Sequence, residues 1–173
     1  MLAEYEVIFE RRISEIATAD DPAHDLLHFK RVVAMAKKLG AEERAQPEIF
    51  IPAAWLHDYV IVSKDDPRRK LASRMSAEGA VQFLKEIRYP EQNLSAISHA
   101  IEAHSFSAGV APQTLEAKVV QDADRLDALG AIGIARCFAT AGLLKRAFYS
   151  AHDPFCEARE ADDHQYTVDH FYR

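Results

Sequence analysis

Hydrophobic side chains recur every three or four positions along most of this chain, and that spacing predicts helices that each bury one face. In residues 2–17 the apolar stripe is made of Leu2, Tyr5, Phe9, Ile13 and Ile16. Similar spacing predicts further helices at residues 23–39, about 47–58, 73 or 76 to about 87, 90 to about 104, 114–129 and 131–148. No segment alternates between apolar and polar residues as a half-buried strand does. The predicted fold class is therefore all-α.

Prolines, glycines and capping residues set the expected ends of these helices. The run Asp20-Asp21-Pro22 supplies a cap and a first-turn proline for the second helix, and Gly40 is expected to stop that helix. Pro52 is expected to restart or kink the third helix, and Gly130 to separate the last two long ones. Loops are expected at residues 60–72, 105–113 and 150–165, before a last helix that begins near 166. Because there is no internal repeat or low-complexity linker, we expect a single domain over residues 1–173, built as a helical bundle.

Composition and charge narrow the class of protein. A chain of 173 residues is long enough for one well-packed core. The formal charge is -6, and the basic cluster Arg68-Arg69-Lys70 is short and lies beside Asp65-Asp66, so we expect no extended contact with DNA or RNA. A small anionic substrate is compatible with this charge, because a bound cation would dominate the field of its site. Cys137 and Cys156 do not form a disulfide framework or a cysteine metal knuckle.

The sequence lacks the patterns typical of export or membrane insertion. Residues 1–10 hold three glutamates and lack the basic start and the uninterrupted apolar stretch of a signal peptide. No run of 18 apolar residues occurs. We therefore expect a soluble, cytoplasmic protein with no membrane partner.

The adjacent pair His57-Asp58 is the strongest chemical signal in the chain. It follows an apolar run at residues 53–56, where a buried helix is expected to end, and neither residue type is usually buried without a partner. A neutral imidazole and a carboxylate can share one divalent cation, which would compensate the buried charge. His28 on the second expected helix and Asp124, at the border of the apolar stripe of the sixth, could complete a shell of two nitrogens and two oxygens. Such a shell suits Mn²⁺, Fe²⁺, Co²⁺, Ni²⁺ or Zn²⁺ better than a soft metal.

Four short segments carry a resemblance to a known family. They are residues 24–32 (HDLLHFKRV), 54–58 (AWLHD), 101–107 (IEAHSFS) and 121–133 (QDADRLDALGAIG). In this order they resemble the motifs of the HD-domain superfamily of metal-dependent phosphohydrolases, and within it a bacterial branch of HD hydrolases. The resemblance covers roughly residues 15–173, with the motif-bearing core at about 15–148. It implies a helical bundle of the HD-domain type that holds one divalent ion (Mn, Ni, Co, Fe, Zn or Mg) through His28, His57, Asp58 and Asp124.

The resemblance also implies a reaction, the hydrolysis of a phosphomonoester, pyrophosphate or phosphodiester by metal-activated water. The substrate would be a small phosphorylated molecule, and a nucleotide is the favoured one. Catalysis would rest on Asp58 and on His104, which could carry a proton. The residues expected to contact substrate are His24, Lys64, His99 and Lys118.

Two other functions remain open for the same residues. His99 and His104 could hold a second ion bridged by Asp58, as in a two-metal phosphodiesterase that cleaves cyclic or linear dinucleotides. Alternatively, the bundle could be a non-catalytic binding module that its metal stabilises.

Simpler structural interpretations also apply to two of the patterns. Asp122, Asp124 and Asp127 could form a solvated acidic face with Arg125, although the motif selects Asp124 as a ligand. Asp122 and Asp127 would then lie at the surface or beside the ligands. The stripe of residues 2–17 could belong to the core or form the contact of a homodimer.

Overall fold

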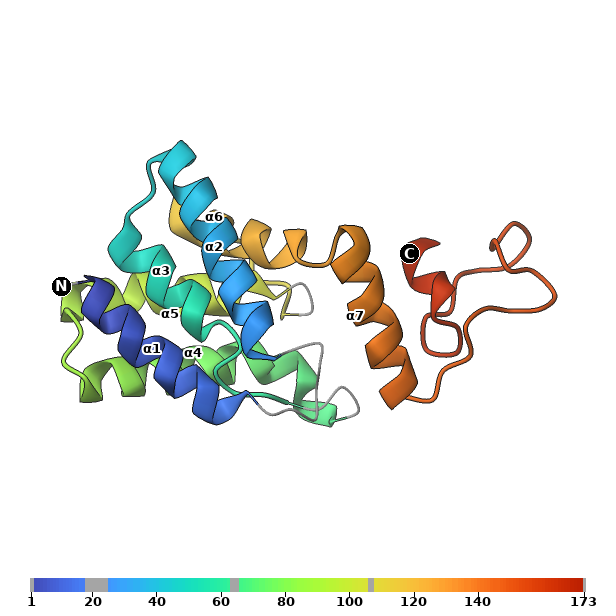
Figure 1. Cartoon of the computed structure of the whole chain (residues 1–173), viewed down its shortest axis with the longest axis horizontal. Helices are drawn as coiled ribbons and strands as arrows, with labels where there is room; N and C mark the ends of the chain where they lie inside the picture. Colours follow the sequence, from blue (N-terminus) through green and yellow to red (C-terminus); the bar gives the residue numbers. More distant parts are fainter. Residues whose placement is uncertain (1, 18–24, 63–65, 106–107, 173) are drawn as a thin grey trace. The chain divides into compact units, whose positions relative to one another are not determined.

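Every regular element in the described part of the chain is helical, which confirms the predicted all-α class (Figure 1). The computed structural model describes residues 2–17, 25–62, 66–105 and 108–172. These residues group into two compact units, of which the first ends at Asp127 and the second begins at Ala128. The single domain over residues 1–173 remains a prediction.

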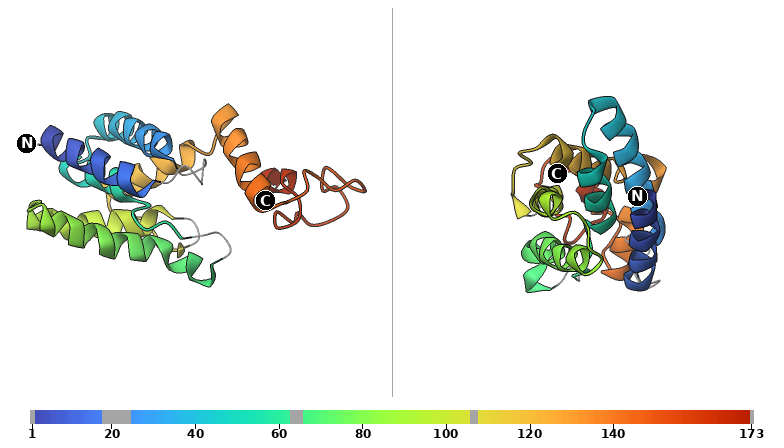
Figure 2. Two further views of the ribbon diagram at one scale, coloured as in Figure 1. Left: turned by 60° about the horizontal axis from the view of Figure 1, so that its bottom comes forward. Right: turned by 90° about the vertical axis from the view of Figure 1, so that its left-hand side faces the viewer.

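The first unit is a helical bundle around one apolar helix, α3. Its elements, with η for 3₁₀ turns, are α1 (Leu2–Ile16), α2 (Leu26–Glu43), α3 (Pro47–Leu56), η1 (Pro67–Leu71), α4 (Ala72–Glu86), η2 (Glu91–Asn93), α5 (Leu94–His104) and α6 (Leu115–Leu126). Every side chain from Ile49 to Leu56 is buried. A helix that is apolar on all sides needs neighbours on all sides, and α3 packs against α1, α2, α5 and α6 (Figure 1, Figure 2). The bundle therefore surrounds His57, the residue that follows α3.

Capping side chains fix the first turns of α2 and α6. Asp25 precedes α2, and its carboxylate accepts a hydrogen bond from the N–H of His28 at 2.9 Å. Thr114 caps α6 as predicted, because its hydroxyl accepts from the N–H of Ala117 at 3.2 Å. The predicted cap at Asp20-Asp21-Pro22 lies outside the described residues. The Asp25 cap holds His28 in the first turn of α2.

The predicted stop of the second helix at Gly40 is wrong. α2 runs through this glycine to Glu43 and ends at Arg44, whose φ of 59° is left-handed. A Cβ atom at Gly40 would lie 2.4 Å from two ring carbons of Phe50 on α3. Gly40 is therefore needed for the close approach of two helices and not for the end of one.

The other predicted boundaries of helices and loops differ less from those in the structure. Pro52 lies inside α3 and does not restart it. α6 ends at Leu126, before the predicted end at Leu129, and the predicted loop at residues 60–72 contains η1.

The second unit contains α7 (Gly130–Leu143) and η4 (Val168–Tyr172), which are joined by a long irregular segment. Backbone hydrogen bonds between Ala147 and residues 165–167 close this segment into a loop, as predicted for residues 150–165. In the described part of the chain, no helix taken singly has the length and apolar character to cross a membrane. Within those same residues, α6 and α7 reach the length and composition of such a span when they are counted together, although the chain bends at the break between them.

One buried ion pair ties the irregular segment to η4. Asp169 has no exposed surface and accepts a hydrogen bond from Arg159, with 2.8 Å between Nη2 and Oδ1. The N–H of Asp162 donates to the same carboxylate at 2.7 Å. Hydrogen bonding from Arg159 lowers the pKa of Asp169 to about 2, so this carboxylate stays ionised at any physiological pH.

Candidate metal centre

Polar side chains from four helices of the first unit lie close together inside the bundle. His28 lies in the first turn of α2, His57 directly follows α3, and Asp124 lies in the last turn of α6. Asp58 follows His57, and His104 is the last residue of α5. The three histidines are buried, whereas the side chains of Asp58 and Asp124 are 19% and 27% exposed. The cluster thus has a buried imidazole side and a partly open carboxylate side.

Three of the four predicted metal ligands, His28, His57 and Asp58, offer ligand atoms within 4.8 Å of one another, and the fourth, Asp124, lies beside the two histidines. Nε2 of His28 lies 3.1 Å from Nε2 of His57. Oδ1 of Asp124 lies 3.6 Å from the His28 nitrogen and 3.8 Å from the His57 nitrogen. Oδ2 of Asp58 lies 3.7 Å from Nε2 of His57. The structure therefore brings together the residues that the sequence motifs select, from positions far apart in the chain.

The hydrogen bonds of the two buried imidazoles determine which nitrogens carry protons. A carbonyl oxygen can only accept, so the 2.8 Å contact between Nδ1 of His57 and the carbonyl of Ala54 places a proton on Nδ1. The carboxylate of Asp127 likewise accepts from Nδ1 of His28 at 2.9 Å. When a ring is neutral, a proton on Nδ1 leaves Nε2 with a lone pair, and the two Nε2 atoms lie 3.1 Å apart. Two facing lone pairs repel, and a cation bound by both removes the repulsion.

The spacing of these atoms suits a divalent ion. Bonds from such ions to nitrogen and oxygen are about 2.0–2.2 Å long, so two ligands at right angles lie about 3.0 Å apart and two tetrahedral ligands about 3.4 Å apart. The two nitrogens are 3.1 Å apart, and the nitrogen–oxygen separations are 3.6–3.8 Å. The donor set of two imidazoles and two carboxylates fits the ions expected from the sequence.

Burial controls the charge of His57. The loss of solvent lowers the pKa of His57 to about 4, against the opposing attraction of Asp58 and Asp124. The ring is therefore neutral at neutral pH, which is the form that binds metals.

His104 has the opposite tendency. Burial acts to lower its pKa, but hydrogen bonding to Asp58 and the charge of Asp58 outweigh burial, and the pKa of His104 is raised. Its Nε2 lies 3.6 Å from Oδ1 of Asp58, and its Nδ1 donates to the carbonyl of Ile101 at 2.6 Å. Asp58 therefore lies between two imidazoles, with Oδ2 towards His57 and Oδ1 towards His104.

Asp127 lies beside the cluster, whereas the sequence left it undecided between the surface and a position beside the ligands. This buried carboxylate accepts from His28 and also from Arg31, whose Nε lies 2.6 Å from Oδ1 and whose Nη2 lies 3.0 Å from Oδ2. Arg31 was not among the residues predicted from the sequence. The available signal was the spacing: Arg31 follows His28 by one helical turn, as Asp127 follows Asp124.

Of the four predicted substrate residues, the structure describes His99 and Lys118. Nε2 of His99 accepts a hydrogen bond from the N–H of Gln113 at 3.0 Å, which secures the segment before α6. Lys118 is exposed on α6. His24 and Lys64 lie outside the described residues. All four substrate contacts remain predictions.

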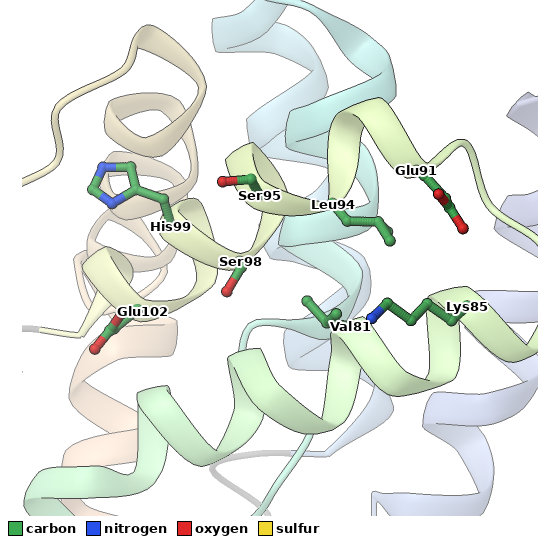
Figure 3. Close-up of a pocket in the computed structure, with 8 residues that line it drawn as sticks. All are labelled: Val81, Lys85, Glu91, Leu94, Ser95, Ser98, His99 and Glu102. Atoms are coloured by element: carbon green, nitrogen blue, oxygen red, sulfur yellow. The ribbon is translucent and has the colours of Figure 1, made fainter.

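An open groove of about 580 Å³ lies between α4 and α5, and His99 lines it (Figure 3). Figure 3 shows His99 and Glu102 towards one end of the groove and Lys85 and Glu91 towards the other. Charges of both signs and two serines, Ser95 and Ser98, line the groove, so its chemistry favours no particular ligand.

The chain belongs to the HD domain family, whose model matches residues 26–129. This match covers more than half of the chain and contains all four predicted ligands.

Relatives with solved structures share the fold over most of this chain. The uncharacterized protein YpgQ of Bacillus subtilis is 34% identical over 141 residues, which are 79% of this chain and 66% of YpgQ. The crystal structure of YpgQ in complex with ADP superposes with a TM-score of 0.67 and 32% identity, covering 94% of this chain and 77% of that one. An HD-superfamily hydrolase from Bacillus thuringiensis superposes with a TM-score of 0.66 and 31% identity, covering 98% and 76%. The predicted bundle of the HD-domain type is thus confirmed, and this chain spans just under two thirds of the length of YpgQ.

Proposed function

We propose that this protein is a metal-dependent phosphohydrolase that cleaves a small phosphate ester or phosphoanhydride, with a nucleotide as its substrate. The observation that carries the proposal is the pair of buried imidazoles whose Nε2 atoms lie 3.1 Å apart beside two carboxylates. Membership of the HD domain family supports it, as does the likeness to an HD-superfamily hydrolase.

In this proposal His28, His57, Asp58 and Asp124 hold one divalent ion. When bound, the ion supplies Lewis acidity and lowers the pKa of bound water from about 15.7 towards about 7. The two carboxylates offset part of the charge of the ion, and the buried imidazoles keep bulk water away from one side of the site.

His104 and Asp58 would take part in proton transfer to the leaving group. The raised pKa of His104 favours its protonated form, so Nε2 can donate a proton to the leaving oxygen of the substrate. The contact of Nδ1 with the carbonyl of Ile101 keeps the ring oriented while the proton leaves. Asp58 balances the positive charge of the ring before the transfer.

A nucleotide is the proposed substrate class because YpgQ, a structural relative at 32% identity, was crystallised in complex with ADP. ADP contains both a phosphoanhydride and a phosphate ester, the two bond types in the proposal. His24, Lys64, His99 and Lys118 are proposed to contact the phosphates, because imidazole and ammonium groups donate well to phosphate oxygens.

Replacing Asp124 should test the proposal directly. Asp124→Ala removes a proposed ligand, so elemental analysis should find less bound metal and a phosphate-release panel of nucleotides should find little turnover. The matched control is Asp122→Ala, because Asp122 lies on the same helix with an exposed side chain. We expect the control to keep both properties. Full metal content and full activity in Asp124→Ala would refute the assignment.

A two-metal phosphodiesterase is the second candidate, and the position of Asp58 favours it. The two oxygens of this carboxylate face different imidazoles, His57 and His104, as a bridging ligand would. Two ions per chain, with turnover of a dinucleotide, would select this candidate over the one-metal enzyme. Bound metal without turnover of any phosphate compound would instead favour a binding module.

A further inference from the structure

We propose that Asp127 and Arg31 set the tautomer of His28 and thereby the affinity of the site for its divalent ion. The inference rests on the proposed metal site and adds two positioning residues to it. Neither residue is a proposed ligand. Both would act through His28.

The contact with Asp127 determines the tautomer of His28. An imidazole can bind a metal through Nε2 only when that nitrogen carries no proton. Asp127 Oδ2 lies 2.9 Å from Nδ1 and can only accept while it is ionised, so it holds the proton on Nδ1. A carboxylate in this position also makes the ring a stronger base towards a metal.

Arg31 in turn stabilises the carboxylate of Asp127. Its side chain is only 5% exposed, and a buried carboxylate needs partners to stay ionised. Arg31 provides two parallel hydrogen bonds, one to each carboxylate oxygen. This planar contact fixes the rotation of the carboxylate, so Oδ2 stays directed at His28.

The positions of these residues on their helices fit the same role. His28 and Arg31 lie one turn apart on α2, and Asp124 lies one turn before Asp127 at the end of α6. Each helix thus presents a proposed ligand and, on the same face, a residue that positions a ligand. The Arg31–Asp127 pair crosses from α2 to α6 beside the cluster, and these two helices pack together.

The test is the affinity of the whole protein for Mn²⁺, measured by calorimetry. Asp127→Asn keeps the size of the side chain but cannot accept through both oxygens, and we expect it to bind Mn²⁺ about 10–100-fold more weakly. Arg31→Lys keeps the charge but loses the planar pair of bonds, so we expect a smaller loss. Asp122→Asn makes the same chemical change at an exposed position of α6 and should leave the affinity unchanged.

A second measurement separates positioning from a purely structural role. In the metal-free wild type, nitrogen NMR should find the proton of His28 on Nδ1, and Asp127→Asn should move part of the population to Nε2. If Asp127→Asn does not fold, Arg31→Lys decides by the same two measurements. Wild-type affinity and an unchanged tautomer in the folded variants would overturn the inference while leaving the metal site intact. A wild type that binds no Mn²⁺ or other divalent ion would overturn both the inference and the proposed function.

Discussion

The location of His57 in the fold explains why its side chain can bind a metal ion. It follows the buried helix α3 directly, has no exposed surface, and donates its Nδ1 proton to the carbonyl of Ala54 one turn back. These three features leave it neutral, oriented and able to offer Nε2 to an ion. Because protonating a buried imidazole is unfavourable, this residue makes the stability of the fold depend on pH.

The metal-stripped protein should lose stability as the pH falls from 6.5 towards 4. The pKa of His57 is 6.5 in its ordinary state and about 4 in the folded protein, so the unfolded chain binds more protons within that window. The unfolding free energy should then fall by on the order of 3 kcal/mol, since one pKa unit is worth about 1.4 kcal/mol. His104 acts in the other direction, because its raised pKa gives stability that is present at low pH and lost as the pH rises through the folded pKa.

Urea unfolding of the wild type and of His57→Gln, at both ends of this window, isolates the contribution of His57. The other titrating groups are common to both proteins, so the difference between their pH dependences belongs to position 57. We expect a weaker pH dependence in His57→Gln. Equal pH dependence in the two proteins would mean that His57 is not held neutral by the fold.

The convergence of the four proposed ligands could be predicted from the sequence, whereas the partner of His28 could not. Each ligand lies in a short local motif that can be read without the fold. The bond between His28 and Asp127 joins residues 99 positions apart, and it depends on the register between α2 and α6. That register is set by side-chain packing over the whole bundle, so Asp127 remained undecided between surface and site.

Among the helices, Gly40 shows where local rules fail. A glycine after an apolar stripe predicts the end of a helix, yet α2 continues through Gly40 because α3 packs too close for any side chain there. Thr114 shows the opposite case. Its cap on α6 depends only on the next three residues, so the sequence predicted it correctly.

Gly40→Ala should destabilise the protein although alanine favours helices. The new Cβ would lie 2.4 Å from the ring of Phe50, which is buried and cannot move freely. Such overpacking costs about 1–3 kcal/mol, and the helix propensity of alanine returns only about 1 kcal/mol. Gly142→Ala is the matched control, because no atom other than those of its chain neighbours and its own helix backbone lies within 4 Å of the position of its Cβ, and it should be neutral or stabilising. Thermal unfolding compares the two variants. If Phe50→Leu restores the stability lost in Gly40→Ala, the strain lies in the contact with the Phe50 ring. A Gly40→Ala protein more stable than the wild type would contradict the prediction.

For the molecule as a whole, the division at Asp127 separates the proposed site from the C-terminal unit. All the proposed ligands, as well as His104 and Arg31, belong to the first unit, which ends at Asp127. In the second unit, the ion pair of Arg159 with Asp169 joins the irregular segment to η4. The two units therefore depend on different buried carboxylates, Asp127 and Asp169, each paired with its own arginine.

Arg159→Ala should loosen the second unit and leave metal binding unchanged. Without the guanidinium, the buried Asp169 keeps only its other partners, such as the N–H of Asp162, and must be hydrated or protonated. Hydrogen exchange at residues 147–168 should then become faster, while the amides of α3 keep their protection and Mn²⁺ affinity stays at the wild-type value. Arg68→Ala is the control, because Arg68 makes a similar two-bond contact with Asp66 at an exposed position and should change neither. If Arg159→Ala weakened Mn²⁺ binding while α3 stayed protected, the metal site would need more of the chain than the residues up to Asp127.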